Sequence, residues 1–71
     1  MATEVLAHIT GTVWKIEAAA GARVSEGDTV VILESMKMEM PVEAEDSGVV
    51  KEIKVEEGES VSEGDTLVVL E

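Results

Sequence analysis

The chain has 71 residues, of which 45% are hydrophobic, and its 16 acidic and 5 basic side chains give a net charge of −11. A chain of this length forms one small domain with a thin core, and without cysteine it has neither disulfides nor cysteine-based zinc sites. The acidic balance argues against binding to nucleic-acid phosphates or to anionic membrane surfaces.

Neither a metal site nor a membrane segment is expected. His8 is the single histidine, so no multi-histidine metal site can form. The first residues lack the basic start and the apolar run of a secretory signal, and no stretch approaches the roughly 20 apolar residues of a membrane span. We therefore expect a soluble, cytoplasmic protein.

Short runs rich in Val and Ile, separated by turn residues, predict an all-β chain. No stretch shows a convincing 3.6-residue apolar period. Eight short strands separated by regularly spaced turns favour a sandwich or barrel. In chain order, the predicted strands are Val5–Ile9, Val13–Ala18, a short strand at Val24, Thr29–Glu34, Met38–Glu43, Val49–Val55, a short strand at Val61, and Thr66–Leu70.

Alternation within the strands assigns some of their faces. Charge at alternate positions marks an outward face, formed by Lys15, Glu17, Glu52 and Lys54, so Ile16, Ile53 and Val55 are predicted to point inward. The predicted core of the two most apolar strands consists of Val31, Leu33, Val68 and Leu70. Trp14, the only aromatic residue, is expected to be partly exposed near a rim, with core packing as the alternative.

The chain consists of two versions of one unit. Residues 11–34 align with residues 48–71 at a constant offset of 37 without a gap, and 13 of the 24 aligned positions are identical. We therefore predict a single domain over residues 1–71, with repeat halves 1–34 and 38–71 joined by a hairpin at residues 35–37. Two halves packed together would bury both apolar faces, with the joint at one end and the termini near the other.

The repeated glycines predict turns. Gly11, Gly21 and Gly27 have mates at Gly48, Gly58 and Gly64, and glycine readily adopts the positive φ that tight turns require. Ser-Glu-Gly-Asp-Thr occurs at residues 25–29 and again at 62–66. These acidic turns lack the five or so alternating oxygen ligands of a calcium loop, so we interpret them as turns that precede an apolar strand.

The joint between the halves is the candidate functional site. Glu34-Ser-Met-Lys-Met-Glu39 leaves room only for a tight hairpin, yet it lacks the Asn-Gly or Asp-Gly pair usual in a two-residue loop. If Met36 and Lys37 are the central residues, both need unusual φ values, and such strain tends to occur at functional sites. Met36 and Met38 flank the lysine at a position expected to be wet, which suggests an adaptable recognition surface. Met40 shares the strand parity of Met38 and is assigned to the core.

A lysine that projects from a hairpin is a suitable target for acylation. Its amine must lose a proton before it attacks an activated acyl group. No histidine or other base lies near Lys37 in the sequence. A modifying enzyme would therefore have to supply the base.

The stretch Glu34-Ser35-Met36-Lys37-Met38-Glu39 resembles the biotin-attachment motif of biotin carboxyl carrier domains, usually Glu-Ala-Met-Lys-Met. The resemblance covers nearly the whole chain and extends to the small stand-alone biotin/lipoyl attachment proteins. It implies a flattened barrel of two four-stranded antiparallel sheets with biotin in amide linkage on Lys37, attached by biotin protein ligase. The ligase would recognise Glu34, Ser35, Met36, Met38 and Glu39. The biotin would carry carboxylate from a biotin carboxylase to a carboxyltransferase.

The sequence departs from the family pattern at three places. Ser35 replaces the common Ala, the stretch at residues 7–10 lacks the Pro-Met pair of many carriers, and residues 18–21 have no thumb insertion. These departures leave the motif intact but do not indicate which carboxylase is served.

Two alternatives to a biotin carrier stand beside it. A lipoyl carrier of a 2-oxo-acid dehydrogenase or of the glycine cleavage system shares the barrel and the central lysine, but its site usually reads Asp-Lys-Ala or similar. An adaptor domain would keep the fold without modification. The chain shows no Ser-His-Asp or Cys-His constellation and no phosphate-binding glycine loop, so we expect a non-catalytic module.

Overall fold

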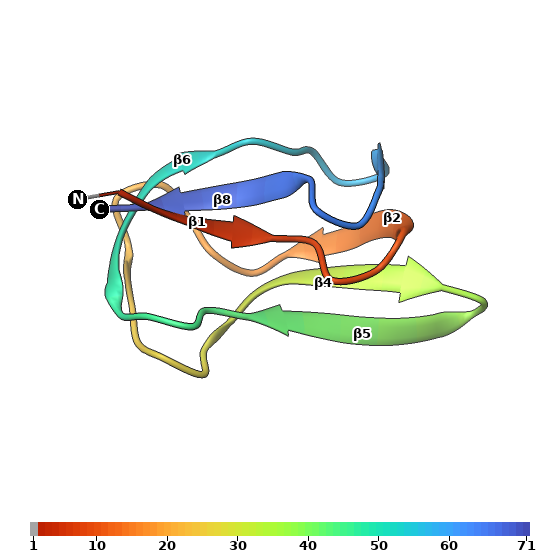
Figure 1. Cartoon of the computed structure of the whole chain (residues 1–71), viewed down its shortest axis with the longest axis horizontal. Helices are drawn as coiled ribbons and strands as arrows, with labels where there is room; N and C mark the ends of the chain where they lie inside the picture. The colour runs from red at the N-terminus through yellow and green to blue at the C-terminus, as the bar shows by residue number, and fades with distance from the viewer. Residues whose placement is uncertain (1) are drawn as a thin grey trace.

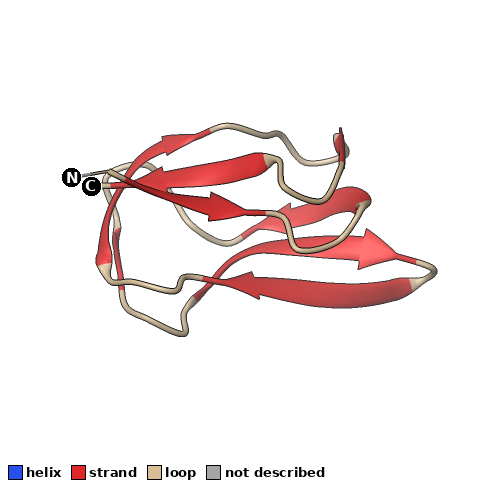
Figure 2. Ribbon diagram, in the orientation of Figure 1, coloured by secondary structure: helices blue, strands red, loops and turns tan. Residues whose placement is uncertain are grey.

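The computed structural model describes residues 2–71, so Met1, where the predicted domain begins, lies outside the described part. These residues form eight strands in two four-stranded antiparallel sheets, which confirms the predicted all-β fold (Figures 1 and 2). The strands are β1 (Thr3–Leu6), β2 (Gly11–Ile16), β3 (Arg23–Val24), β4 (Thr29–Ser35), β5 (Met38–Glu43), β6 (Gly48–Ile53), β7 (Ser60–Val61) and β8 (Thr66–Leu70).

The two sheets have the same design with the strands of the two repeats exchanged. One sheet has the order β1-β8-β6-β3 and the other has the order β5-β4-β2-β7. An offset of 37 residues converts β1 to β5, β2 to β6, β3 to β7 and β4 to β8, so it converts each sheet into the other. Every sheet therefore contains strands from both halves of the sequence, and neither half could form its sheet alone.

The core lies between the sheets and consists mainly of Val and Leu. The predicted core positions Val31, Leu33, Val68 and Leu70 are all buried. Val55 is buried as predicted, while Ile16 and Ile53 are partly buried and pack against the core. Since burial of apolar area is the main favourable term in folding, these short strands are held chiefly by this shared layer.

Two buried residues do not follow the predicted alternation. Val30 and Leu67 are completely buried although each lies next to a core residue in its strand. They are repeat mates, and each falls where the register of its strand pair shifts, between Thr29 and Val31 in one half and opposite Val5 and Leu6 in the other. A β-bulge places one extra residue outside the two-residue period, so both parities become buried.

Some predicted strand boundaries were wrong by two or three residues. The predicted strand Val5–Ile9 lies at Thr3–Leu6 in the structure, because Ala7 pairs instead with the 64–65 turn through Ala7 N to Asp65 O (2.8 Å) and Gly64 N to Ala7 O (2.9 Å). Strand β2 begins earlier than predicted, at Gly11, because Gly11 and Thr12 pair with β7. Its mate β6 likewise begins at Gly48 and ends at Ile53.

Each of the two Ser-Glu-Gly-Asp turns forms hydrogen bonds to the other half of the chain. The amide of Ser25 donates to Asp28 Oδ2 at 2.8 Å, and the repeat mate Ser62 donates to Asp65 Oδ2 at the same distance. Gly27 has a φ of 92° and its amide donates to the carbonyl of Ala44, across the repeat boundary. These contacts agree with the interpretation of both stretches as turns.

The predicted outward face is exposed and carries two ion pairs. Lys15 Nζ lies 3.7 Å from Glu17 Oε1, and Lys54 Nζ lies 3.1 Å from Glu52 Oε2. Trp14 is 46% exposed, as expected for a position near a rim.

The molecule is elongated, with extents of 33 × 18 × 17 Å. The β4–β5 hairpin forms one end, and the start of β1 lies beside the end of β8 at the other (Figure 1). Thr3 of β1 pairs with Leu70 of β8 at the terminal end. The predicted joint of the two halves is therefore the apex of the molecule.

Candidate functional site

Met36 and Lys37 form the two-residue turn between β4 and β5. The ladder runs up to the pair Ser35 and Met38, which leaves only these two residues in the loop. Their φ values are 52° for Met36 and 66° for Lys37, and within residues 2–71 they are the non-glycine residues with positive φ. Positive φ at both central positions is what a type I′ hairpin turn requires. The unusual backbone expected from the sequence is thus present.

The inner face of the hairpin continues the apolar layer of the core outward. The cross-strand pairs on this face are Val31 with Val42, Leu33 with Met40, and Ser35 with Met38. Burial declines along the series: Val42 is buried, Met40 is partly buried, and Met38 is 62% exposed. The hairpin extends past the end of the core, so its last apolar side chains are not covered by the other sheet within residues 2–71.

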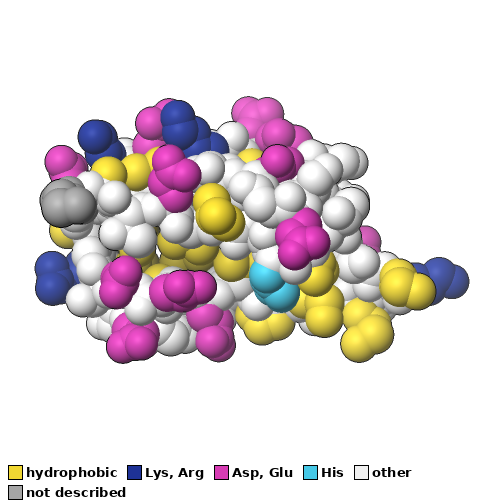
Figure 3. Space-filling model, viewed as in Figure 1, with side chains coloured by type: hydrophobic (Ala, Val, Ile, Leu, Met, Phe, Trp, Pro, Cys, Tyr) yellow, Lys and Arg dark blue, Asp and Glu magenta, His cyan; other side chains and the backbone are white. Residues whose placement is uncertain are grey.

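Met36 is 92% exposed, which makes the apex unusually apolar for a surface turn. Figure 3 shows apolar side chains gathered at the hairpin end of the molecule, with a basic group beyond them. Methionine is flexible and polarisable, which suits a surface that adapts to a partner. The prediction that Met36 and Met38 are exposed is confirmed. The assignment of Met40 to the core was wrong: Met40 is only partly buried and is neither a core residue nor packed against the core, because the hairpin extends beyond the core.

Gly11 supports the base of the hairpin in a way that its sequence pattern did not reveal. The sequence suggested a turn glycine, but Gly11 lies in β2 and does not have a positive φ. A Cβ at this position would lie 2.6 Å from the carbonyl oxygen of Glu34 and 3.5 Å from the Cβ of Ser35. Gly11 thus allows β2 to approach the strand that carries the site. The repeat mate Gly48 makes a similar close approach at the other end, since a Cβ added there would lie 3.0 Å from the carbonyl oxygen of Glu71.

Two carboxylates and one amine define the electrostatics of the apex. Glu34 and Glu39 are exposed and lie directly opposite each other in the β4–β5 ladder. Lys37 is exposed, and no carboxylate of residues 2–71 lies within ion-pairing distance of it. The amine is thus held outward by the turn and is not engaged by a side chain of the described part.

The six residues of the predicted motif are therefore brought together at one end. Glu34 and Ser35 end β4, Met36 and Lys37 form the turn, and Met38 and Glu39 begin β5. Ser35 is partly buried beside Gly11, which explains why a small residue occupies this position. Among residues 2–71 there is no group of three or more His, Asp or Glu side chains arranged to hold a metal ion.

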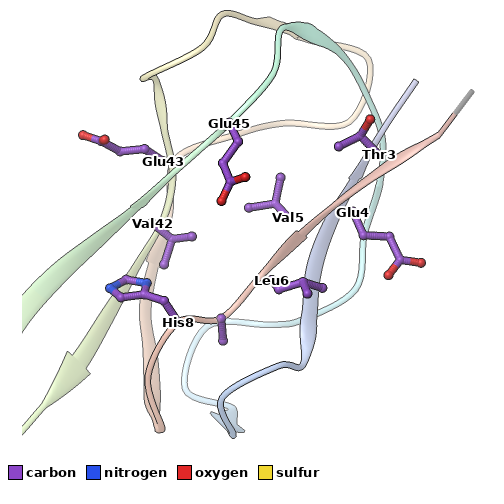
Figure 4. A pocket seen from close by; sticks show the side chains of 9 residues that line it. Thr3, Glu4, Val5, Leu6, His8, Val42, Glu43 and Glu45 are labelled. Carbon is purple, nitrogen blue, oxygen red and sulfur yellow. The ribbon is translucent and has the colours of Figure 1, made fainter.

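A groove of about 330 Å³ lies between the edge strands β1 and β5, away from the apex. The side chains of Val5 and Val42 point into it, whereas Glu4 and Glu43 point outward (Figure 4). Val42 is five strand residues from Lys37, a separation of roughly 17 Å. The groove is thus separate from the motif.

Comparison with known proteins places this chain in a family. Residues 1–70 match the biotin/lipoyl family described as "Biotin-requiring enzyme". The chain belongs to this family, which confirms the resemblance based on the motif at residues 34–39. Within residues 2–71 the structure contains no helix that is long and apolar enough to span a membrane.

The curated relatives include small proteins of related description. The chain is 50% identical to the "Biotinylated protein TB7.3 homolog" of Mycolicibacterium smegmatis over 44 residues, which are 62% of each chain. It is 48% identical to the "Biotin/lipoyl attachment protein" of Bacillus subtilis over 40 residues, 56% of this chain and 55% of the relative. The matched part thus spans about three-fifths of the length of these relatives.

Similar solved structures are parts of much larger enzymes. The urea carboxylase of Kluyveromyces lactis superposes with a TM-score of 0.93 and 41% identity over 99% of this chain, which is 6% of the enzyme. A single-chain, multi-domain long-chain acyl-CoA carboxylase superposes with a TM-score of 0.89 and 34% identity over 96% of this chain and 7% of the enzyme. The two-sheet fold is therefore shared with segments of carboxylases.

Proposed function

We propose that the chain is a biotin carrier in which biotin protein ligase attaches biotin to Lys37 through an amide. One observation carries this proposal. Lys37 is exposed at the apex of a two-residue turn, between a methionine that is 92% exposed and one that is 62% exposed. The family match and the relatives described as biotinylated support it.

The residues at the apex fit an acyl group on the lysine. The turn directs the amine away from the body of the protein, and no ion pair within residues 2–71 has to be broken before it reacts. The ammonium must still lose its proton, and the chain has no histidine near the apex: His8 lies in the loop after β1. The ligase therefore supplies the base, and this chain supplies position and exposure.

The recognition surface for the ligase consists of Glu34, Ser35, Met36, Met38 and Glu39. The methionines offer apolar, adaptable contact, and the two carboxylates offer charge on the outer face of the hairpin. Four of these residues lie on the paired strands β4 and β5 and Met36 lies in the turn between them, so the hairpin fixes their geometry relative to Lys37.

Biotin attached to Lys37 would carry a carboxyl group from the biotin carboxylase site to the carboxyltransferase site of a partner system. The chain contributes a rigid mount and contains no catalytic constellation of its own in the described part. Superposition on segments of two carboxylases supports this role. Catalysis belongs to those partners, and the carrier is expected in the cytoplasm with them.

A lipoyl carrier is the second candidate. The Bacillus subtilis relative is described as a biotin/lipoyl attachment protein. The two methionines that flank Lys37 favour biotin, because they match the biotin-carrier motif.

The intact mass of the protein purified from its native cells tests the proposal. We expect the mass to increase by one biotinyl group, and Lys37→Arg to abolish the increase while the thermal unfolding midpoint stays unchanged. A mass increase of one lipoyl group would favour the second candidate instead, and an unmodified mass would favour an adaptor domain.

A second experiment tests the recognition surface. We expect Met36→Leu and Met38→Leu to slow loading by ligase with little change in thermal stability, because neither side chain belongs to the core. Met40→Leu is the matched control, and its effect should fall on stability because Met40 is partly buried opposite Leu33. Loss of stability with unchanged loading for Met36→Leu and Met38→Leu would assign these two residues to packing.

A further inference from the structure

We propose that Met36 and Met38 form an oxidation site that controls the loading of Lys37. Conversion of their thioethers to sulfoxides by a peroxide would make the apolar surface around Lys37 polar and block its recognition by the ligase. The control of loading rests on the proposed biotin function, whereas the oxidation site itself does not.

Met36 and Met38 are the most exposed methionines among residues 2–71, so an oxidant in solution reaches their sulfur atoms first. Met36 is 92% exposed and Met38 is 62% exposed, whereas Met40 is partly buried opposite Leu33. The sequence contains no cysteine, so no thiol in the chain competes for the oxidant. Oxidation of methionine follows access to solvent, and Met36 is therefore expected to react before Met40.

The reaction is a two-electron oxidation of sulfur by hydrogen peroxide. A sulfur lone pair attacks one peroxide oxygen, the O–O bond breaks, and an S=O bond forms. The departing hydroxide takes the proton left on the transferred oxygen and leaves as water, so each methionine consumes one peroxide and gains one oxygen atom. Methionine sulfoxide reductases reverse the step at the expense of a thiol reductant.

Oxidation of Met36 and Met38 would alter the surface next to Lys37. The two sulfurs belong to the residues immediately before and after Lys37, on the turn and on the first residue of β5. A partner that handles the amine has to approach both of them. Sulfoxide replaces a flexible apolar side chain by a polar, chiral one, so the contact surface changes while the amine itself does not.

The fold should survive this change. Neither Met36 nor Met38 is part of the core or packs against it. The hairpin is held by backbone pairing from Thr29–Glu43 to Ser35–Met38, which oxidation leaves in place. The modification is therefore local and reversible, as a regulatory site requires.

The first experiment maps the oxidation. The folded protein is treated with limiting hydrogen peroxide, catalase is added, and the methionines are quantified by peptide mass mapping. We expect sulfoxide at Met36 and Met38 well before Met40, which serves as the internal control. Equal oxidation at Met40 would overturn the site.

The second experiment measures loading. Catalase-quenched wild type and the variant M36L/M38L are each given biotin, ATP and biotin protein ligase. The readout is the ratio of the treated to the untreated rate for each protein. For the wild type we expect peroxide treatment to lower the loading rate about tenfold, so that the ratio is about 0.1, because sulfoxides replace apolar contacts on both sides of the lysine. The ratio should stay near one for the variant and return to one for the wild type after treatment with sulfoxide reductases.

Two results would overturn control by oxidation: a wild-type ratio near one, or an equal fall in the variant, which would place the effect elsewhere. Failure of the proposed function looks different, because the untreated wild type would then take up no biotin. In that case control of loading also fails, and the mapping experiment alone decides whether the oxidation site exists.

Discussion

Met36 and Lys37 occupy backbone conformations that Asn and Gly adopt more readily. Their φ values of 52° and 66° lie in the left-handed region, where an ordinary side chain costs about 1–2 kcal/mol. A long amine at the apex cannot be supplied by Asn or Gly. Strain at this turn is therefore consistent with selection for what the side chains present rather than for stability.

Met36→Asn should stabilise the protein and impair its loading. Asn tolerates positive φ, so we expect the free energy of unfolding to rise by about 0.5–1 kcal/mol, measured as an increase in the urea midpoint. Met38→Asn is the control: it lies in β5, where Asn is disfavoured, and should give no increase. An unchanged midpoint for Met36→Asn would show that the turn is not strained.

Gly11→Ala should destabilise the hairpin more than its repeat mate Gly48→Ala. The new Cβ would lie 2.6 Å from the Glu34 carbonyl oxygen, inside a paired strand, but 3.0 Å from that of Glu71, which lies beyond the end of β8. We expect losses of about 1–3 kcal/mol for Gly11→Ala and a smaller loss for Gly48→Ala, by urea unfolding. Equal losses would contradict a tighter approach at Gly11 than at Gly48, and no loss for Gly11→Ala would contradict the close approach of β2 to the base of the hairpin.

At the scale of the element, the β4–β5 hairpin retains an unfavourable charge arrangement. Glu34 and Glu39 are exposed and directly opposite in the ladder, and like charges in this position destabilise a sheet. The hairpin is therefore suboptimal both at its turn and at its first outer-face pair, and both features lie beside Lys37.

Glu39→Gln should relieve this repulsion. We expect the free energy of unfolding to rise by about 0.2–1 kcal/mol, and the gain over wild type to shrink as sodium chloride is added, because salt screens exposed charges. A gain that does not depend on salt would indicate a cause other than repulsion. Slower loading of the same variant would support Glu39 as a recognition residue.

At the scale of the whole molecule, the two ends are related by the repeat. The offset of 37 residues converts the β4–β5 pair into the β8–β1 pair. One end is closed by the Met36–Lys37 turn, and at the other Thr3 of β1 pairs with Leu70 of β8. The two ends differ in connectivity and in side chains rather than in strand arrangement.

This arrangement predicts that a circular permutant opened at the apex will still fold. Joining the termini with a short Gly-Ser linker and opening the chain between Met36 and Lys37 should preserve the strand pairing, since the new loop spans neighbouring strands. We expect a native-like amide NMR spectrum and loss of ligase loading, because the closed turn is gone. Failure to fold would show that this turn is required for strand pairing, and full loading would show that the turn geometry is dispensable.

The local pattern of the sequence predicted the eight strands to within two or three residues and the hairpin that carries Lys37. Val- and Ile-rich runs between repeated glycines predicted eight strands, and the offset of 37 placed Lys37 at the joint. The missing Asn-Gly pair predicted unusual φ values at Met36 and Lys37. These features depend on neighbours along the chain, so they could be inferred from it.

Tertiary structure alone decided the bulges, the role of Gly11 and the environment of the apex. Val30 and Leu67 are buried because strand pairs slip by one residue, and Gly11 is required because Glu34 lies against it from a strand distant in sequence. The opposition of Glu34 and Glu39, and the extension of Met38 beyond the core, likewise depend on register. Each of these results from contacts between segments that only folding brings together, and a single sequence does not specify their distances.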